Sequence, residues 1–137
     1  MLDLTFNPIS REEIHKLETA LLVGTLFRKE VMEEIRNSSE RLTWVDSLAV
    51  AAGALARAKA NMTVSQIADE LGRTEATIRE HIKGTSKAGK LINETFEMLK
   101  SGELDIDAIL ASPSKYSEIK KELLEILEKL EGVISKL

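Results

Sequence analysis

The sequence predicts an all-α protein, on the basis of its composition, its helix-capping pairs and its apolar periodicity. Among 137 residues there are only two prolines and seven glycines, and aromatic residues make up 4% of the chain. Because strands favour aromatic and β-branched residues, this composition favours helices. At two of the predicted helix starts, a Ser or Thr stands three residues before Glu or Gln. Apolar residues recur at intervals of three and four, which predicts amphipathic helices and no strand.

The N-terminal part is predicted to form one long amphipathic helix. Ser10 and Glu13 have the spacing of a capping box, and Ile9 and Ile14 occupy the positions of a hydrophobic staple. The apolar rhythm then continues to about Asn37, with a bend near Gly24 as the alternative to a straight helix, and the sequence NSSE interrupts it. By the same reasoning, helix N-caps are predicted at Ser10, Thr43, Thr63 and Thr74.

The middle of the chain is predicted to contain several shorter helices. Thr43, with Asp46 three residues later, precedes the alanine-rich sequence WVDSLAVAAGALARAKA, whose small side chains suit a helix that its neighbours approach closely. Further along, Gly84 ends a predicted helix, and another is expected from about Lys87 to Lys100. One or two more turns and a long final helix complete the predicted fold.

The most informative segment is TVSQIADELGRTEATIREHI, residues 63–82. Its spacing places Ala68 where two helices cross, Gly72 at a tight turn, and Ile78 facing back into the core. The turn needs a residue that tolerates positive φ, and the crossing leaves no room for a side chain larger than alanine. Because these steric requirements coincide within twenty residues, the segment predicts a helix-turn-helix.

These residues resemble the helix-turn-helix domains of transcriptional regulators. They match the pattern IA-x-x-LG-x-[ST]-x-x-TI-x-x-H, which is shared by response-regulator effector domains and the promoter-reading region of sigma factors. This resemblance covers about Trp44 to Lys100 and implies DNA binding. Through the continuation IKGTSKAGKLINETFEMLKSGE, the chain also resembles a probable regulatory domain of archaea that is encoded beside KaiC-like ATPases.

The second helix of the motif is predicted to read bases in a major groove. The exposed residues near its N-terminus are the expected readers, and these are Glu75, Ala76, Thr77 and Arg79. Ala76 and Thr77 suit a thymine methyl group, and the Glu75 carboxylate can accept a hydrogen bond from cytosine N4. The Arg79 guanidinium can pair with guanine.

Contacts to the DNA backbone are predicted around this helix. A helix N-terminus, a turn and a basic segment can each hold phosphate, and the residues expected to do so are Thr63, Ser65, Gln66, Arg73, Lys83, Lys87 and Lys90. The chain as a whole has a formal net charge of −4, so any attraction to phosphate is expected to be local.

The stretch GTSKAGKL, residues 84–91, nearly matches the phosphate-binding loop G-x-x-x-x-G-K-[ST] of nucleotide-hydrolysing proteins. Leu91 replaces the hydroxyl residue that holds Mg²⁺, and the stretch follows a predicted helix instead of a strand. We therefore interpret Lys87 and Lys90 as contacts to the DNA backbone, with a solvated basic loop as the alternative.

The sequence predicts no catalytic residues, no cofactor and no metal site. There is no cysteine, and His15 and His81 are isolated, so no metal-ligand pattern or catalytic triad is recognisable. We therefore predict that the protein is not an enzyme. The N-terminus lacks the basic region of a signal peptide, and the apolar runs are too short to span a bilayer. These features predict a cytoplasmic protein with no membrane partner.

The last helix carries an apolar seam that is predicted to mediate dimerisation. Its residues alternate at intervals of three and four, and they are Ile119, Leu123, Ile126, Leu130, Val133 and Leu137. Packing within one chain would give the same spacing, particularly since Leu127 and Ile134 widen the stripe. Helix-turn-helix proteins usually need two copies to read two half-sites, so we predict a homodimer.

Taken together, these patterns predict a DNA-binding transcriptional regulator whose partner is double-stranded DNA. The chain divides into an N-terminal helical segment (1–42), a helix-turn-helix domain (43–102) and a C-terminal amphipathic helix (103–137). The alternative is a protein-interaction adaptor, which Glu75, Glu80 and the acidic net charge favour because phosphates repel carboxylates. The second resemblance implies a KaiC-like ATPase as the protein partner of such an adaptor.

Overall fold

The computed structural model describes residues 4–111 and 113–135. Within these ranges the chain forms eight helices and no strand, which confirms the all-α prediction. The helices are α1 (Arg11–Leu26), α2 (Lys29–Asn37), α3 (Arg41–Lys59), α4 (Val64–Leu71), α5 (Glu75–Lys83), α6 (Lys87–Ser101), α7 (Ile106–Ala111) and α8 (Pro113–Ser135).

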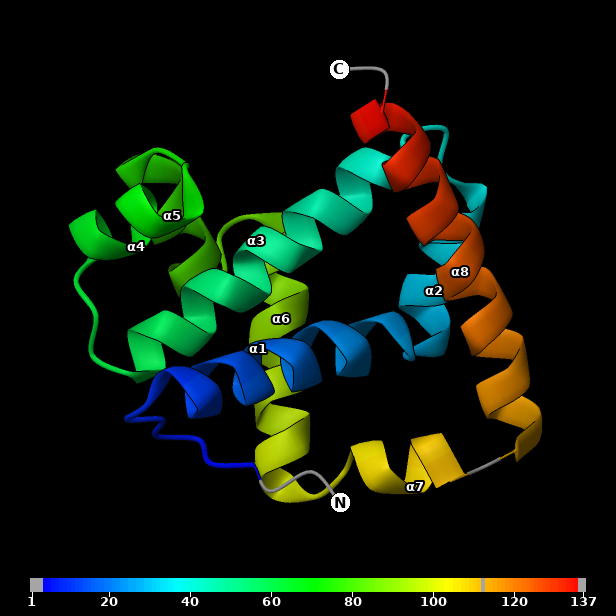
Figure 1. Cartoon of the computed structure of the whole chain (residues 1–137). Helices are drawn as coiled ribbons and strands as arrows, with labels where there is room; N and C mark the ends of the chain where they lie inside the picture. The colour runs from blue at the N-terminus through cyan, green and yellow to red at the C-terminus, as the bar shows by residue number, and fades with distance from the viewer. Residues whose placement is uncertain (1–3, 112, 136–137) are drawn as a thin grey trace.

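Helix α3 is the central element of the fold, and α1 and α6 pack against it (Figure 1). Residues 51–57 of α3 are buried on every side of the helix. Four of these seven residues are alanines and one is glycine, so neighbouring helices can approach closely around the whole circumference. The alanine-rich sequence therefore has the packing role that was predicted for it.

The ends of α3 carry different parts of the molecule. Figure 1 shows α4 and α5 at one end of the fold and α8 at the other. Buried residues of α1, α2, α3, α6, α7 and α8 belong to one apolar core, so the predicted segments 1–42, 43–102 and 103–137 share it. No helix in the described ranges is both long enough and apolar enough to cross a membrane.

The prediction of one helix up to Asn37 is wrong, because the chain breaks between α1 and α2. Arg28 has an extended backbone (φ −70°, ψ 129°) and a largely buried side chain. Its Nη1 donates to the Leu91 carbonyl oxygen at 3.0 Å and to Thr95 Oγ1 at 3.2 Å, both in α6. The break accompanies this long-range anchor and lies four residues after Gly24, which is itself still helical in α1.

Three of the four predicted N-caps are confirmed, at Ser10, Thr63 and Thr74. The cap predicted at Thr43 is wrong, since α3 begins two residues earlier at Arg41 and its N-cap, Glu40, makes no side-chain capping bond. The predicted staple is also wrong, because Ile9 is 92% exposed while Ile14 belongs to the core. The local patterns alone therefore do not determine where α3 begins or whether Ile9 is buried.

The middle of the predicted seam on α8 packs within the chain. Ile126 is buried, and Leu123 and Leu130 are partly buried against the main core. Glu122 adds an ion pair with Arg36 of α2 at 3.0 Å. The other predicted dimerisation residues lie outside the described residues, namely the side chains of Ile119 and Val133 and the whole of Leu137. The homodimer therefore stays a prediction.

Candidate nucleic-acid interface

Helices α4 and α5 and the turn between them, which we call the helix-turn-helix unit, follow the predicted spacing. Gly72 ends α4 in the left-handed conformation at φ 66°, where its N–H donates to the Ala68 carbonyl oxygen. Thr63 and Gln66 form the predicted capping box at the start of α4. Thr74 Oγ1 accepts from the Thr77 N–H at 3.1 Å and so begins α5. Local hydrogen bonds thus define both ends of the turn.

A small apolar cluster joins the helix-turn-helix unit to α3. Ile67 and Ile78 have no exposed surface, Ala68 is buried, and all three pack with Ala54 of α3. Ala68 therefore lies at the helix crossing, as its spacing predicts. A larger side chain at this position would separate α4 from α5.

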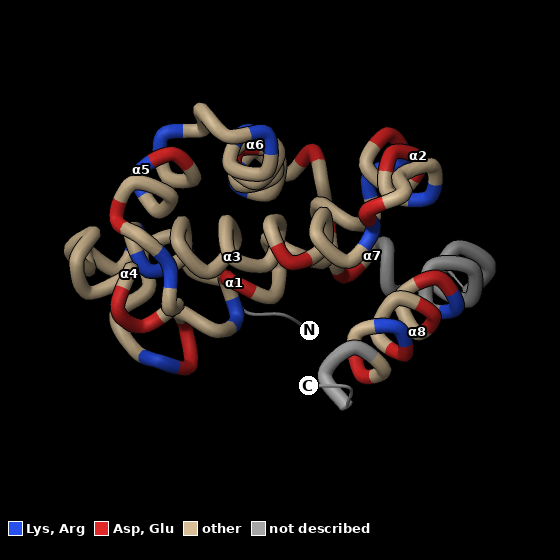
Figure 2. The backbone as a smooth tube through the Cα atoms, turned by 90° about the horizontal axis from the view of Figure 1, so that it is seen from above, with Lys and Arg blue, Asp and Glu red and all other residues tan. Residues whose placement is uncertain are grey.

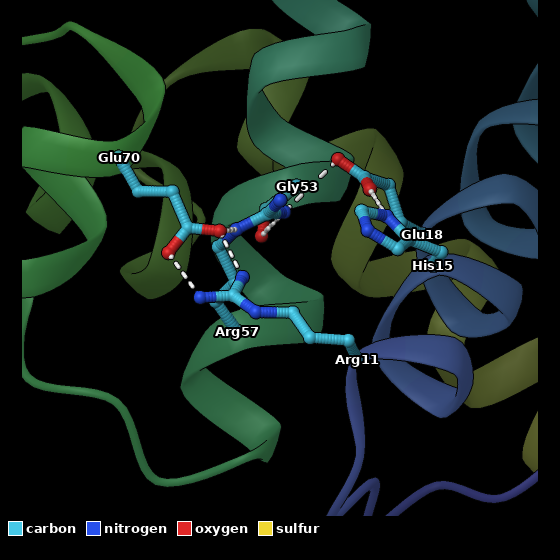
Figure 3. Close-up of polar contacts among 6 residues, drawn as sticks. All are labelled: Arg11, His15, Glu18, Gly53, Arg57 and Glu70. Carbon is cyan, nitrogen blue, oxygen red and sulfur yellow. Dashed lines mark hydrogen bonds and ion pairs between the residues drawn. The ribbon is translucent and has the colours of Figure 1, made fainter.

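A buried arginine is a second link between the helix-turn-helix unit and the rest of the fold (Figure 3). Arg57 of α3 is only 5% exposed. Its Nη1 donates to Glu18 Oε2 of α1 at 3.0 Å, and its Nε donates to Glu70 Oε1 of α4 at 3.0 Å. Arg11 donates from the start of α1 to both carboxylate oxygens of Glu70. These four residues, which we call the Arg57 network, hold α1, α3 and α4 together.

The hydrogen bonds of the Arg57 network favour the ionised form of the Glu70 carboxyl group. Hydrogen bonds, first from Arg11 and then from Arg57, lower the pKa of Glu70 to about 2. Gly53 makes room for the network, because a Cβ there would lie 2.6 Å from Glu18 Oε2. None of these roles was predicted from the sequence. The available signal was a lone arginine within the apolar face of an alanine-rich helix, since such a charge needs partners when buried.

The stretch of residues 84–91, which follows α5 and contains the first turn of α6, has a packing role. A Cβ at Gly89 would lie 2.5 Å from the His81 carbonyl oxygen and 2.7 Å from its Cα, so α6 can approach the end of α5 only with glycine there. Asn93 of α6 donates from Nδ2 to the carbonyl oxygens of His81 at 3.2 Å and Ile82 at 3.3 Å. Asn93 therefore caps the C-terminus of α5, a role that the sequence analysis did not anticipate.

His81 also belongs to this junction. Its side chain is buried, with Nδ1 2.7 Å from the hydroxyl oxygen of Ser86, the N-cap of α6. Burial lowers the pKa of His81, which favours the neutral ring, and Nδ1 shares a hydrogen bond with the Ser86 hydroxyl. Over the part of the chain that the structure describes, no three His, Asp or Glu side chains are grouped so as to hold a metal ion.

The predicted base-reading residues lie together on the first turns of α5. Glu75, Ala76 and Arg79 are exposed, and Thr77 is half-buried. Arg79 Nη2 pairs with Glu75 Oε1 at 3.1 Å along the helix. Thr77 Oγ1 accepts from the Thr74 hydroxyl at 2.9 Å, so the capping interaction already uses one of its lone pairs. Ala76 and Arg79 therefore offer the more accessible contacts on this surface.

A shallow depression brings the first turn of α4 beside the first turn of α5. It is lined by Ser65, Gln66, Ala68, Asp69, Gly72, Arg73, Thr74, Glu75 and Thr77. The structure thus brings three predicted phosphate contacts, Ser65, Gln66 and Arg73, next to two of the predicted base readers, Glu75 and Thr77. Thr63, the N-cap of α4, is exposed, so the N-terminus of this helix faces solvent.

Several of the predicted basic contacts have acidic partners in the chain. Arg73 Nη2 lies 3.1 Å from Asp46 Oδ2 of α3. Lys87 pairs with Glu34 of α2, and its Nζ lies 4.7 Å from the centre of the Trp44 ring. These partners are distant in sequence, which is why the motif did not reveal them. Lys83 and Lys90 are exposed and form no ion pair with any residue that the structure describes.

The chain is similar in sequence to a known protein. The chain is 58% identical over 120 residues to the uncharacterized protein MJ1053 of Methanocaldococcus jannaschii, a match that covers 86% of this chain and 71% of that protein. No protein-family model matches the chain. No solved structure matches it either.

Proposed function

We propose that this chain, which belongs to the same family as protein MJ1053 of Methanocaldococcus jannaschii, is a transcriptional regulator that binds double-stranded DNA. The observation that carries the proposal is the shared depression at the first turns of α4 and α5. Helix-turn-helix proteins present base readers and phosphate contacts in this relative position. The first turns of α5 would enter a major groove while α4 lies along the backbone.

The ion pairs on this surface are compatible with DNA binding. The side chains of Arg73 and Asp46 are 40% and 57% exposed, and those of Arg79 and Glu75 are similarly open. Exposed pairs of this kind contribute about 0–1 kcal/mol each. A phosphate or a guanine edge can therefore replace the carboxylate at small cost. Lys83 and Lys90 would add phosphate contacts without breaking an ion pair.

The test begins with selection of bound fragments from sheared genomic DNA, followed by affinity measurements over a series of salt concentrations. Arg79→Ala should relax the preference at one base pair by about 1–3 kcal/mol. The double variant Lys83→Ala/Lys90→Ala should weaken binding to all sequences and reduce the salt slope by about 2, since each phosphate contact contributes about 0.9. Lys87→Ala should have a smaller effect, because Lys87 is already paired with Glu34.

A matched control is Lys16→Ala/Lys129→Ala, which removes the same charge from α1 and α8. It should leave the salt slope unchanged, because neither residue lies in the helix-turn-helix unit. Equal loss of affinity in both double variants would mean that only net charge matters and that the assigned interface is wrong. Failure of the unaltered protein to retain any DNA at low salt would refute the DNA-binding proposal.

The second candidate function is that of a protein-interaction adaptor. It is favoured by the internal pairing of Arg73, Arg79 and Lys87 with carboxylates. In Figure 2, positive and negative residues are interspersed over α4 and α5 and do not form a single basic stripe. Such a surface suits a protein partner with its own mixed charges.

The adaptor candidate has a direct test. The resemblance of residues 82–103 to the archaeal regulatory domain makes a KaiC-like ATPase the partner to try first. Purified ATPase should bind the unaltered chain in a fixed ratio after nuclease treatment, and Arg73→Glu should weaken this binding. Binding that disappears with nuclease would instead support a DNA bridge.

A further inference from the structure

The outward face of α8 differs from the face that packs on the core. Leu124 and Leu127 are 48% and 51% exposed, whereas Ile126 between them is buried. Apart from Ile9, they are the large apolar side chains that stand most exposed in the part of the chain that the structure describes. Two leucines that are three positions apart in the sequence lie side by side on a helix. They form the apolar centre of this face.

Charged residues flank the two leucines in a definite order. Lys121 lies three residues before Leu124, and Glu128 and Glu131 lie four residues after Leu124 and Leu127, so all five share one side of α8. Lys121, Glu128 and Glu131 are exposed, and none forms an ion pair with another described residue. The face is therefore basic toward the N-terminus of α8, apolar in the middle and acidic toward the C-terminus.

We infer that a second copy of this chain covers the outward face of α8, with the two α8 helices antiparallel about a twofold axis. A twofold contact joins the same patch on both subunits, so the patch must be complementary to itself. In the antiparallel arrangement, Lys121 meets Glu128 and Glu131 of the second copy, and Leu124 meets its Leu127. A parallel arrangement would oppose like charges at both ends, which is unfavourable.

This interface is distinct from the seam that the periodicity of the last helix predicts. Leu123, Ile126 and Leu130 pack toward the core of their own chain, whereas the inferred contact uses the other side of α8. Both views show α8 at the opposite end of the molecule from α4 and α5 (Figures 1 and 2). Pairing through α8 would therefore leave both helix-turn-helix units uncovered.

The pairing of two chains has a consequence for DNA binding. This consequence rests on the proposed function, whereas the pairing itself does not. With α8 at the centre of the dimer, the two helix-turn-helix units lie at its far ends. Their half-sites should then be more than one helical turn apart, and one turn corresponds to about 34 Å. The expected separation is thus longer than that of many helix-turn-helix dimers.

Sedimentation equilibrium of the full chain over a series of concentrations tests the pairing by charge exchange. Lys121→Glu and Glu131→Lys should each raise the dimer dissociation constant about tenfold, because each opposes like charges. The double variant Lys121→Glu/Glu131→Lys should recover part of the lost affinity, since it re-forms the ion pair between positions 121 and 131 with the charges exchanged, while Glu128 is unchanged. Lys129→Glu, an exposed change elsewhere on α8, is the control and should leave the constant unchanged.

Each alternative result overturns the inference in its own way. An unaltered chain that is monomeric at all concentrations rules out the pairing. Single variants that dimerise normally, or a double variant that stays monomeric with unchanged circular dichroism, rule out the antiparallel contact.

DNA binding is measured separately on the same samples. A dimer that does not bind DNA would refute only the proposed function. A monomer that binds DNA would refute only the pairing.

Discussion

The helix-turn-helix unit and the main core are stabilised by different kinds of interaction. The main core joins leucine, isoleucine, valine and phenylalanine side chains from six helices. The helix-turn-helix unit has only three buried apolar residues, Ile67, Ala68 and Ile78, which pack on Ala54 of α3. The Arg57 network and the α5–α6 junction supplement them with charged hydrogen bonds and close backbone packing. The proposed DNA-binding surface therefore depends on specific polar geometry more than on buried area.

The largest expected effect comes from removing the centre of the Arg57 network. Arg57→Met keeps the length of the buried stem but leaves Glu18 without its guanidinium partner and weakens the hold on Glu70. Removing one partner of a buried ion pair costs about 3 kcal/mol, which chemical denaturation should detect. Hydrogen exchange in α4 should accelerate more than exchange in α6.

Lys29→Met is the matched control, because Lys29 is exposed on α2 and a surface change of this kind stays within about 0.5 kcal/mol. If both variants lose the same stability, the network contributes nothing of its own. Uniform acceleration of exchange throughout the protein would show that the helix-turn-helix unit does not depend on Arg57 more than the main core does.

A smaller effect is expected at the junction of α5 and α6. Gly89→Ala would force a Cβ against the backbone of His81, which should destabilise the fold by about 2 kcal/mol. Gly132→Ala in α8 is the control, since a Cβ there meets nothing within 4 Å and alanine favours helix by up to about 1 kcal/mol. Thermal melting of the two variants should therefore shift in opposite directions. A harmless Gly89→Ala would contradict the close approach of α6.

The smallest expected effect is a loss of stability at low pH. The pKa of Glu70 is lowered to about 2 in the folded chain, from about 4.3 in an unfolded one. At pH values above both of these pKa values, Glu70 is ionised in the folded and in the unfolded state, and its hydrogen bonds stabilise the fold. As the pH falls from about 4.5 toward 2, the unfolded state takes up a proton first, so stability decreases. Because the Glu70 side chain is partly exposed, screening limits the loss to about 1 kcal/mol.

Denaturation of the unaltered chain and of Glu70→Gln over this pH range isolates the contribution of Glu70. The variant should start less stable at neutral pH and should lose less stability on acidification. Parallel curves for the two proteins would mean that other carboxyl groups cause the acid sensitivity.

The fold class, the ends of α4 and α5 and the crossing at Ala68 could all be predicted from the sequence. These features depend on interactions between residues close in the chain, such as the capping pair Thr63 and Gln66 or the left-handed turn at Gly72. Short-range steric and hydrogen-bond rules are therefore enough to identify the helix-turn-helix unit and the residues on its surface.

Other features depend on partners that lie far apart in the sequence. The break at Arg28 accompanies an anchor in α6, and the charge of Lys87 is paired with Glu34 of α2. The heptad spacing of α8 could not reveal which side of the helix faces the core, because a stripe that packs inward and one that packs on another chain look alike. Local patterns specify where helices begin and end, whereas tertiary packing decides which charges are paired and which helix faces are left for a partner.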